Sequence, residues 1–393
     1  MFCSKCGNEV SENAGFCPMC GNMLHAGRSG AEEPAMEKTG ESAKEPGKKK
    51  RKPVRVIIAI GICVLAASYF LPLNRDWEVD TYGGGTCSIK YKGNEDKLEI
   101  VIPEKIKKGW KLYEVTTLGS YAFSGCENLA SIEIPDSVTD IYDGAFMGCY
   151  SLTEIELPDG VKEIPRNTFL ACSSLKSIEL PAGVTSIGED CFSGCNNLND
   201  IELPDSLTSI GASAFESCYN LVGIEIPDSV TSIGENCFYG CGSLRNIQIP
   251  AGVTSIGAST FEHCVSLVNI QIPDGVTEIG DDAFKSCAGL RNIELPAAGL
   301  TEIGRSVFEG CSSLQGIELP DSLTVIRDNA FSGCSSLTEI ELPDGLKEIE
   351  NWAFARCNGL RSIEIPDSVT ELGAHAFEDC SNLTVILPDG STY

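Results

Sequence analysis

Apolar residues recur along most of the chain in a short fixed pattern. In residues 152–158, Leu152, Ile155 and Leu157 are apolar and Glu156 is charged. This alternation predicts a short strand that points Ile155 and Leu157 inward and Glu156 outward. The proline that follows ends the strand, because it has no N–H group to donate to a ladder. The next apolar pair, in V-T-x-I-G, predicts a second short extended segment. The A-F-x-x-C sequence after it predicts a tight turn whose phenylalanine and cysteine fill the interior.

This unit repeats along the chain and is marked by one cysteine per copy. The intervals are all 23 residues except one of 24, where an extra alanine enters near Ala297-Ala298. Such a period predicts a solenoid, in which each repeat buries its apolar edge against its neighbour. A solenoid more often offers a contact surface than a pocket for chemistry. The marking cysteines are Cys126, Cys149, Cys172, Cys195, Cys218, Cys241, Cys264, Cys287, Cys311, Cys334, Cys357 and Cys380.

Two positions in the repeat predict details of its packing. The residue after the second isoleucine is usually glycine, but Tyr142, Pro165, Arg327 and Glu350 replace it. Proline fixes φ near −65°, so the position does not require a positive φ, and we expect glycine there because of crowding. Disulfides between rungs would need Cβ atoms about 3.8 Å apart, closer than parallel stacking allows. We therefore expect a ladder of buried free thiols.

The first 25 residues carry metal-ligand spacing. Cys3 and Cys6 form one C-x-x-C pair, and Cys17 and Cys20 form another, with glycine after each pair. Four thiolates in this arrangement suit a tetrahedral Zn²⁺ ion, and so short a segment needs the metal to fold. A pair of redox dithiols is the alternative, but no strand–helix context accompanies it. The segment resembles a short zinc ribbon, with Zn²⁺ as a structural cofactor.

Three further segments precede the repeats. Residues 26–53 are small, charged and proline-containing, which predicts a flexible basic linker. Residues 54–73 are predicted as a transmembrane helix, because no charge lies between Val56 and Asn74. A buried core helix and a cleaved signal peptide are the alternatives, and the complete ribbon before the apolar run disfavours the second. The cations at 48–52 and Arg55 predict a cytoplasmic N-terminus and an extracellular repeat domain.

The repeats of residues 98–388 resemble the BspA-type leucine-rich repeats, since a dozen units match that pattern. The resemblance implies a mainly β fold, a curved solenoid, and a role in surface adhesion or ligand binding. We expect residues 74–103 to form an N-terminal cap with hairpin character, with 98–103 as a degenerate first strand. The leucine-rich repeat solenoid is predicted to cover 104–393, and its C-terminal edge is a candidate for self-association.

Charge divides the chain sharply. Residues 1–73 have a net charge of +3 and the remainder −30, so we expect no nucleic-acid partner. The residue between the inward positions of the first strand is glutamate in nine repeats, and Gln248 and Gln271 are the exceptions. The glutamate column is explained either by solubility or by a track for cations. The two glutamines that interrupt this column are explained either by a binding role or by sequence drift among the repeats. The candidate ligand-binding residues are Arg245, Asn246, Gln248, Asn269, Gln271, Arg291 and Asn292.

The chain offers no convergent catalytic set. It has three histidines, His25, His263 and His375, and none is accompanied by a matching nucleophile. We therefore expect a non-enzyme, and two functions remain. One is a membrane-anchored surface protein whose repeats bind an extracellular protein or glycan. The other is a transmembrane receptor or scaffold whose cytoplasmic zinc ribbon recruits a protein partner.

Overall fold

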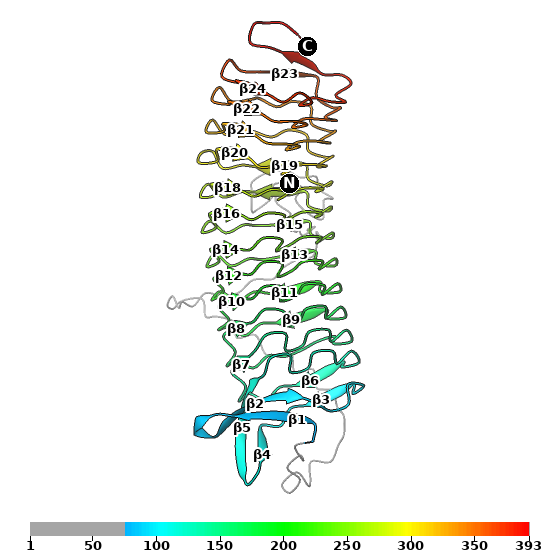
Figure 1. The fold of residues 1–393 in the computed structure, drawn as a ribbon, viewed down its shortest axis with the longest axis vertical. Helices are drawn as coiled ribbons and strands as arrows, with labels where there is room; N and C mark the ends of the chain where they lie inside the picture. The colour runs from blue at the N-terminus through cyan, green and yellow to red at the C-terminus, as the bar shows by residue number, and fades with distance from the viewer. Residues whose placement is uncertain (1–74, 393) are drawn as a thin grey trace, which may run out of the picture. The chain divides into compact units, whose positions relative to one another are not determined.

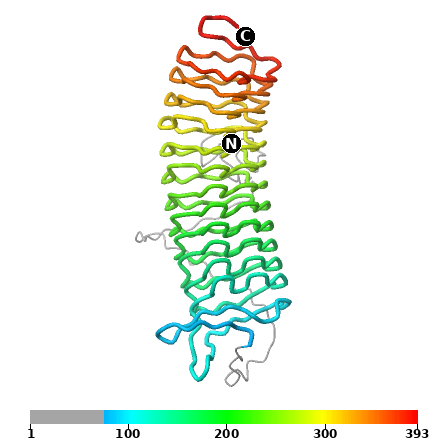
Figure 2. The backbone as a smooth tube through the Cα atoms, viewed as in Figure 1, coloured from blue at the N-terminus to red at the C-terminus, as the bar shows by residue number. Residues whose placement is uncertain are grey.

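The computed structural model describes residues 75–392, which form a mainly β solenoid. Each repeat contributes one rung, and the rungs stack in chain order from the N-terminal sheet to the C-terminal end (Figures 1 and 2). Two ladders of short parallel strands run along the stack. The predicted zinc ribbon, linker and transmembrane helix of residues 1–73 lie outside the described residues. Within residues 75–392, no helix has the length and apolar character needed to cross a membrane.

The first ladder is built from the strand that contains the predicted alternating pattern. Ile155 and Leu157 are buried and Glu156 is exposed, as the alternation predicts. Residues 98–103 supply its first strand, which pairs in parallel with the following repeat. The strands of this ladder are β3 (Glu99–Val101), β6 (Ser131–Glu133), β9 (Ser177–Glu179), β11 (Asp200–Glu202), β13 (Gly223–Ile224), β15 (Asn246–Ile247), β17 (Asn269–Gln271), β19 (Asn292–Glu294), β23 (Ser362–Glu364) and β25 (Thr384–Ile386).

The second ladder is built from the V-T-x-I-G segments, each with one buried isoleucine beside an outward residue except the last, where Leu372 is exposed. Its members pair in parallel and at the same register within three separate sheets, and the first member pairs with the N-terminal sheet. The strands are β7 (Asp140–Ile141), β8 (Glu163–Ile164), β10 (Ser186–Ile187), β12 (Ser209–Ile210), β14 (Ser232–Ile233), β16 (Ser255–Ile256), β18 (Glu278–Ile279), β20 (Glu302–Ile303), β21 (Val325–Ile326), β22 (Glu348–Ile349) and β24 (Glu371–Leu372).

A column of phenylalanines fills the interior along the whole stack. It runs from Phe123 to Phe377, one ring per repeat, with neighbouring centroids 5.2–5.7 Å apart and nearly parallel planes. The separation exceeds the strand spacing of about 4.8 Å, so the rings stack with an offset, which their quadrupoles favour. The A-F-x-x-C segment that carries each ring is a tight turn, as predicted.

The cysteine ladder consists of free thiols, which confirms the prediction. Every cysteine between residues 75 and 392 is free, and all are buried except the half-buried Cys380. From Cys149 onward, each repeat's marking thiol donates to the carbonyl of the phenylalanine in the preceding repeat, with S···O distances of 3.0–3.3 Å. Each of these carbonyls also accepts the backbone N–H of the cysteine three residues later, so the thiol is its second donor and the thiol itself has a hydrogen-bond partner.

The glycine after the second isoleucine marks a close approach between repeats, as predicted. Gly211 and Gly280 do not have positive φ. A Cβ atom on either glycine would lie 2.6 Å from a backbone nitrogen of the preceding repeat, Glu189 or Ala258. Crowding, and not backbone handedness, therefore explains the glycines at these two positions.

A five-stranded sheet closes the N-terminal end of the solenoid. It contains β1 (Trp77–Thr81), β2 (Thr86–Tyr91), β4 (Lys105–Lys108) and β5 (Lys111–Leu118), and β7 joins it through β5. The 3₁₀ turn η1 (Gly83–Gly85) connects β1 to β2 in an antiparallel hairpin. Tyr91 continues the phenylalanine stack at 5.9 Å from Phe123, and Trp77 packs edge-on against both rings.

Candidate ligand-binding surface

The seven candidate residues lie on, or directly beside the ends of, three adjacent strands in the middle of the first ladder. β13, β15, β17 and β19 form one sheet in that order, and all seven side chains are exposed. Asn246, Asn269 and Asn292 are direct partners across β15, β17 and β19. Gln248 follows β15 and Gln271 ends β17, where it pairs with Glu294. The structure therefore brings together all seven residues, and we call them the central patch.

The three asparagines form a column of amides across the sheet. The side-chain amide of Asn292 donates to Oδ1 of Asn269 over 2.9 Å. An amide ladder of this kind leaves both donors and acceptors facing solvent, since each side chain offers two of each. The flanking rungs place Gly223 and Gly316 at the same register position. The column is therefore bounded on both sides by residues without side chains.

A second column beside the amides alternates between apolar and basic residues. Backbone hydrogen bonds join this column from rung to rung. The amide of Arg245 donates to the carbonyl of Val222, the amide of Val268 to the carbonyl of Arg245, and the amide of Arg291 to the carbonyl of Val268. Arg245 and Arg291 are exposed and take part in no ion pair found among residues 75–392. Their guanidinium groups therefore remain available to carbonyl, carboxylate or hydroxyl groups of a ligand.

The structure adds three exposed apolar side chains that the sequence reasoning missed. Tyr219, Val222 and Val265 are 52%, 50% and 48% exposed. Tyr219 and Val265 follow the marking cysteines of repeats two apart, and the repeat between them has Gly242 at that position. A Cβ atom on Gly242 would lie 3.9 Å from Val265. For Tyr219 and Val265, the available signal was their departure from the polar or small residues that most repeats carry directly after the marking cysteine.

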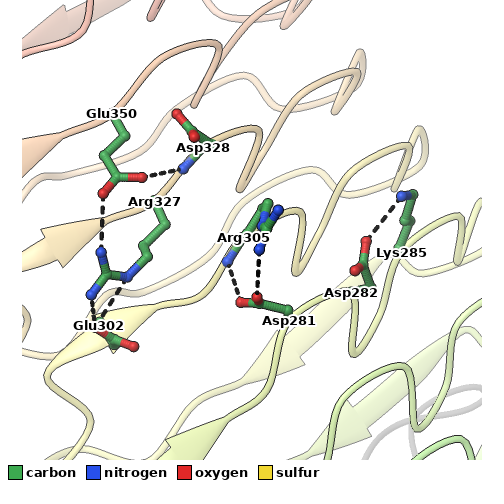
Figure 3. Close-up of polar contacts among 8 residues, drawn as sticks. All are labelled: Asp281, Asp282, Lys285, Glu302, Arg305, Arg327, Asp328 and Glu350. Atoms are coloured by element: carbon green, nitrogen blue, oxygen red, sulfur yellow. Dashed lines mark hydrogen bonds and ion pairs between the residues drawn. The ribbon is translucent and has the colours of Figure 1, made fainter.

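Several other cations of the solenoid form ion pairs within the protein. On the second ladder Arg327 bridges Glu302 and Glu350, at 2.7 and 3.1 Å (Figure 3). The hydrogen bond to Glu302 raises the pKa of Arg327. Arg305 binds Asp281, and Lys285 binds Asp282. Arg245 and Arg291 of the central patch differ from these cations because they are unpaired, a state that they share with Lys162, Lys176, Lys347 and Arg361 among residues 75–392.

The described histidines occupy exposed turns and form no catalytic arrangement with a nucleophile. Nε2 of His263 lies 3.7 Å from Oε1 of Glu262, and Nδ1 of His375 lies 3.6 Å from Oε2 of Glu378. Two open depressions of about 480 and 390 Å³ lie at the C-terminal end, near Phe377, away from the central patch. In the part of the chain that the structure describes, no three His, Cys, Asp or Glu side chains are grouped to hold a metal ion.

Comparison with protein families identifies the repeats. The model of the BspA type leucine rich repeat region matches residues 111–222, 162–291, 208–325 and 254–384. The model of a zinc-ribbon domain matches residues 2–24. That match contains Cys3, Cys6, Cys17 and Cys20, whose geometry lies outside the described residues. The donor set of four thiols at C-x-x-C spacing fits a structural zinc ion.

Solved structures show the same repeat architecture. A leucine-rich repeat protein from Bacteroides ovatus is 29% identical, with a TM-score of 0.63 over 80% of this chain and 93% of that one. The pneumococcal vaccine antigen PcpA is 22% identical, with a TM-score of 0.55 over 80% and 87%. A leucine rich cell surface protein from Faecalibacterium prausnitzii is 30% identical over 75% and 94%, with a TM-score of 0.49. No curated protein matches the chain. The solenoid fold is typical of recognition proteins, and no enzyme family is indicated.

Proposed function

The chain belongs to the BspA-type leucine-rich repeat family, and on this premise we propose that it is a membrane-anchored surface protein whose repeats bind an extracellular protein or glycan. Residues 54–73 cross the membrane in this proposal, the ribbon is cytoplasmic, and the solenoid is outside. The apolar run and the cations before it support this topology. The buried thiols are compatible with an oxidising exterior, because an oxidant reaches them only when the repeats open.

The observation that carries the recognition role is the central patch. Nine of eleven repeats place a glutamate at the outward position of the first strand, and the patch replaces two of them with neutral amides. Unpaired arginines lie on the same rung as these amides or on the next rung, and the exposed Tyr219 lies in the turn that precedes β13 in the same sheet. Amides and guanidinium groups bind sugar hydroxyls or the carbonyls of an extended peptide, and tyrosine supplies a flat apolar contact. The surrounding carboxylates favour a ligand that is not strongly acidic.

Surface exposure can be measured on intact cells that express the full chain. Protease treatment should release peptides from the repeats, while peptides from residues 1–25 should appear only after the cells are lysed. The proposal would be refuted if the repeat peptides stayed protected until lysis. Recovery of the whole chain in the soluble fraction after membranes are removed would refute it equally.

The recognition role is tested by restoring the glutamate column. The double variant Gln248→Glu and Gln271→Glu should weaken binding of the full chain in nanodiscs to a glycan array and to a set of extracellular proteins. The matched control is Thr153→Glu and Thr338→Glu, which adds two exposed charges to the same ladder outside the patch. A ligand that binds the wild type and both variants equally would rule out the central patch as its site.

The match of residues 2–24 to a zinc-ribbon domain supports the second candidate function, a receptor or scaffold. In that case the ribbon recruits a cytoplasmic protein, and ligand binding outside is coupled to that partner. Deletion of residues 1–25 separates the two functions. A surface binder keeps its binding to the extracellular ligand and its cellular role after the deletion, whereas a scaffold keeps the binding and loses the role.

A further inference from the structure

The β4–β5 hairpin of the N-terminal sheet differs in charge from the rest of the solenoid. Residues 119–392 contain 41 acidic and 11 basic residues. The hairpin holds four of the eleven lysines that follow residue 74, within the seven residues from Lys105 to Lys111. All four lysine side chains are exposed. A cationic projection on an acidic body attracts an anionic surface that the rest of the solenoid repels.

The turn of this hairpin presents a tryptophan that no neighbour covers. Lys108 and Lys111 are paired across the strands, and the two-residue turn between them is Gly109-Trp110. Gly109 has φ of +65°, which the first central position of such a turn favours. Trp110 is 100% exposed, and Leu112 beside it is 43% exposed. The hairpin extends away from the stacked repeats (Figures 1 and 2).

This arrangement contributes little to the stability of the fold. Paired lysines on adjacent strands repel each other, and a fully exposed indole gains nothing from burial. Lys111 lies over the ring of Tyr113 at 5.0 Å, and Lys108 donates to the carbonyl of Val79. Lys105 and Lys107 take part in no ion pair found in residues 75–392. Trp110, Lys105 and Lys107 therefore break local rules without a compensating contact, which indicates a binding role.

We propose that the β4–β5 hairpin docks on the anionic headgroup region of the membrane, with Trp110 at the interface and the lysines over the headgroups. Tryptophan is enriched at the level of lipid headgroups, and lysines near an anionic surface bind it electrostatically. The inference rests in part on the proposed membrane anchor. In that topology at most three residues, 74–76, separate the predicted span from β1, which belongs to the same sheet as the hairpin.

Docking would set the direction in which the repeats leave the membrane. Three extended residues reach about 10 Å, so they would hold the sheet near the bilayer but leave its orientation free. A second contact at the hairpin removes that freedom. The central patch, on β15, β17 and β19, would then be presented at a fixed height above the membrane.

The test uses the full chain in nanodiscs that contain a headgroup spin-labelled lipid, which quenches nearby tryptophan fluorescence. The nanodiscs are made of phosphatidylcholine alone or of phosphatidylcholine with phosphatidylglycerol. Quenching should be stronger with phosphatidylglycerol, and Trp110→Phe should abolish this increase. Trp352→Phe is the matched control, because Trp352 is also exposed but lies near the other end of the stack, and it should keep the increase.

Charge is tested separately from the indole. Each lysine near an anionic surface contributes about a fivefold factor to binding, so Lys105→Gln with Lys107→Gln should lower the docking constant about 25-fold. Lys162→Gln with Lys176→Gln removes two exposed lysines of the repeats and should have no effect. The proposal is overturned if Trp110→Phe leaves the quenching of the inserted chain unchanged, or if phosphatidylglycerol has no effect. The second result would favour a protein partner for the hairpin.

Failure of the membrane anchor would be distinguishable from failure of the hairpin. A chain without a transmembrane span would not be retained in the nanodiscs. The free full chain is then mixed with phosphatidylglycerol vesicles and sedimented. Co-sedimentation that Trp110→Phe and the lysine variant reduce would support the hairpin alone, and an absence of co-sedimentation would overturn it.

Discussion

The glycine column predicts a large effect from a single added methyl group. Gly211 does not have positive φ, so alanine is conformationally allowed there. Its Cβ atom would lie 2.6 Å from Glu189 N and from Gly188 C, and 2.9 Å from Gly188 O. These are backbone atoms of the preceding repeat, and they can move only if the two rungs separate. Separation would stretch the 2.8 Å hydrogen bond from Gly211 to Ile187 and the 5.4 Å stack of Phe192 on Phe215.

The cost of Gly211→Ala follows from these contacts. Overpacking in a rigid interior costs about 1–3 kcal/mol, and weakening one backbone hydrogen bond adds about 1 kcal/mol. We expect the free energy of unfolding to fall by about 2–4 kcal/mol. The assay is equilibrium urea unfolding followed by circular dichroism. The slope of the unfolding free energy against urea concentration is compared between variants, because a stack of repeats can open locally and a lower slope would reveal it.

Gly316→Ala is the matched control for this experiment. Gly316 also lacks positive φ, but no atom lies within 4 Å of its Cβ position. The substitution should stabilise the protein by about 0.4–1 kcal/mol, because alanine restricts the unfolded chain. If Gly211→Ala and Gly316→Ala changed the stability equally, the close approach between repeats would not be the reason for the glycine column.

Three further predictions concern the interior and the metal. Phe238→Ala should destabilise the solenoid by about 3–5 kcal/mol in urea unfolding, because it leaves a cavity between stacked rings, and a cost below that of Gly211→Ala would contradict the packing argument. Burial raises the pKa of Cys126 to about 11 and of Cys241 to about 12, from an ordinary value near 9, so the unfolded chain loses these protons first. Stability should therefore fall as the pH rises above 9. Apart from the half-buried Cys380, the repeat thiols should react with a thiol reagent at pH 8 only in denaturant, and rapid labelling of these buried thiols in the native protein would refute the burial. Cys6→Ser should remove zinc, measured by metal release, without changing the melting of the repeats, and a matching loss of repeat stability would show that the two folds are coupled.

The repeat pattern predicts the fold in detail because each contact in a solenoid is made between neighbouring copies. The alternation around Glu156 correctly predicts which strand face is buried. Pro165 at a position that is usually glycine shows that positive φ is not needed there, and the crowding inferred from it is found in the structure. The free thiols follow from the strand spacing, which is a general property of parallel ladders. The N-terminal sheet is less predictable, because it does not repeat. Trp110 lies in a stretch for which the pattern predicts no regular element, and its hairpin forms from a local turn and the pairing of β5 with β2.

The candidate site also has one part that the sequence predicts and another part that it does not. A constant register is enough to place Asn246, Asn269 and Asn292 on adjacent strands, so the sequence alone predicts that the central patch is continuous. The exposure of Tyr219 and Val265 depends on how the turns after the cysteines fold, which a strand pattern does not specify.

The sequence alone determined the period, the inward and outward faces, and the rung on which each residue lies, since these follow from alternation and from contacts between adjacent copies. Only the tertiary structure decided which charges are neutralised and which apolar side chains stay uncovered. Arg327 reaches carboxylates on the rungs before and after it, whereas Arg245 forms no ion pair among the described residues. That difference depends on side-chain geometry across several repeats, because an ion pair forms only where two flexible side chains meet within about 4 Å.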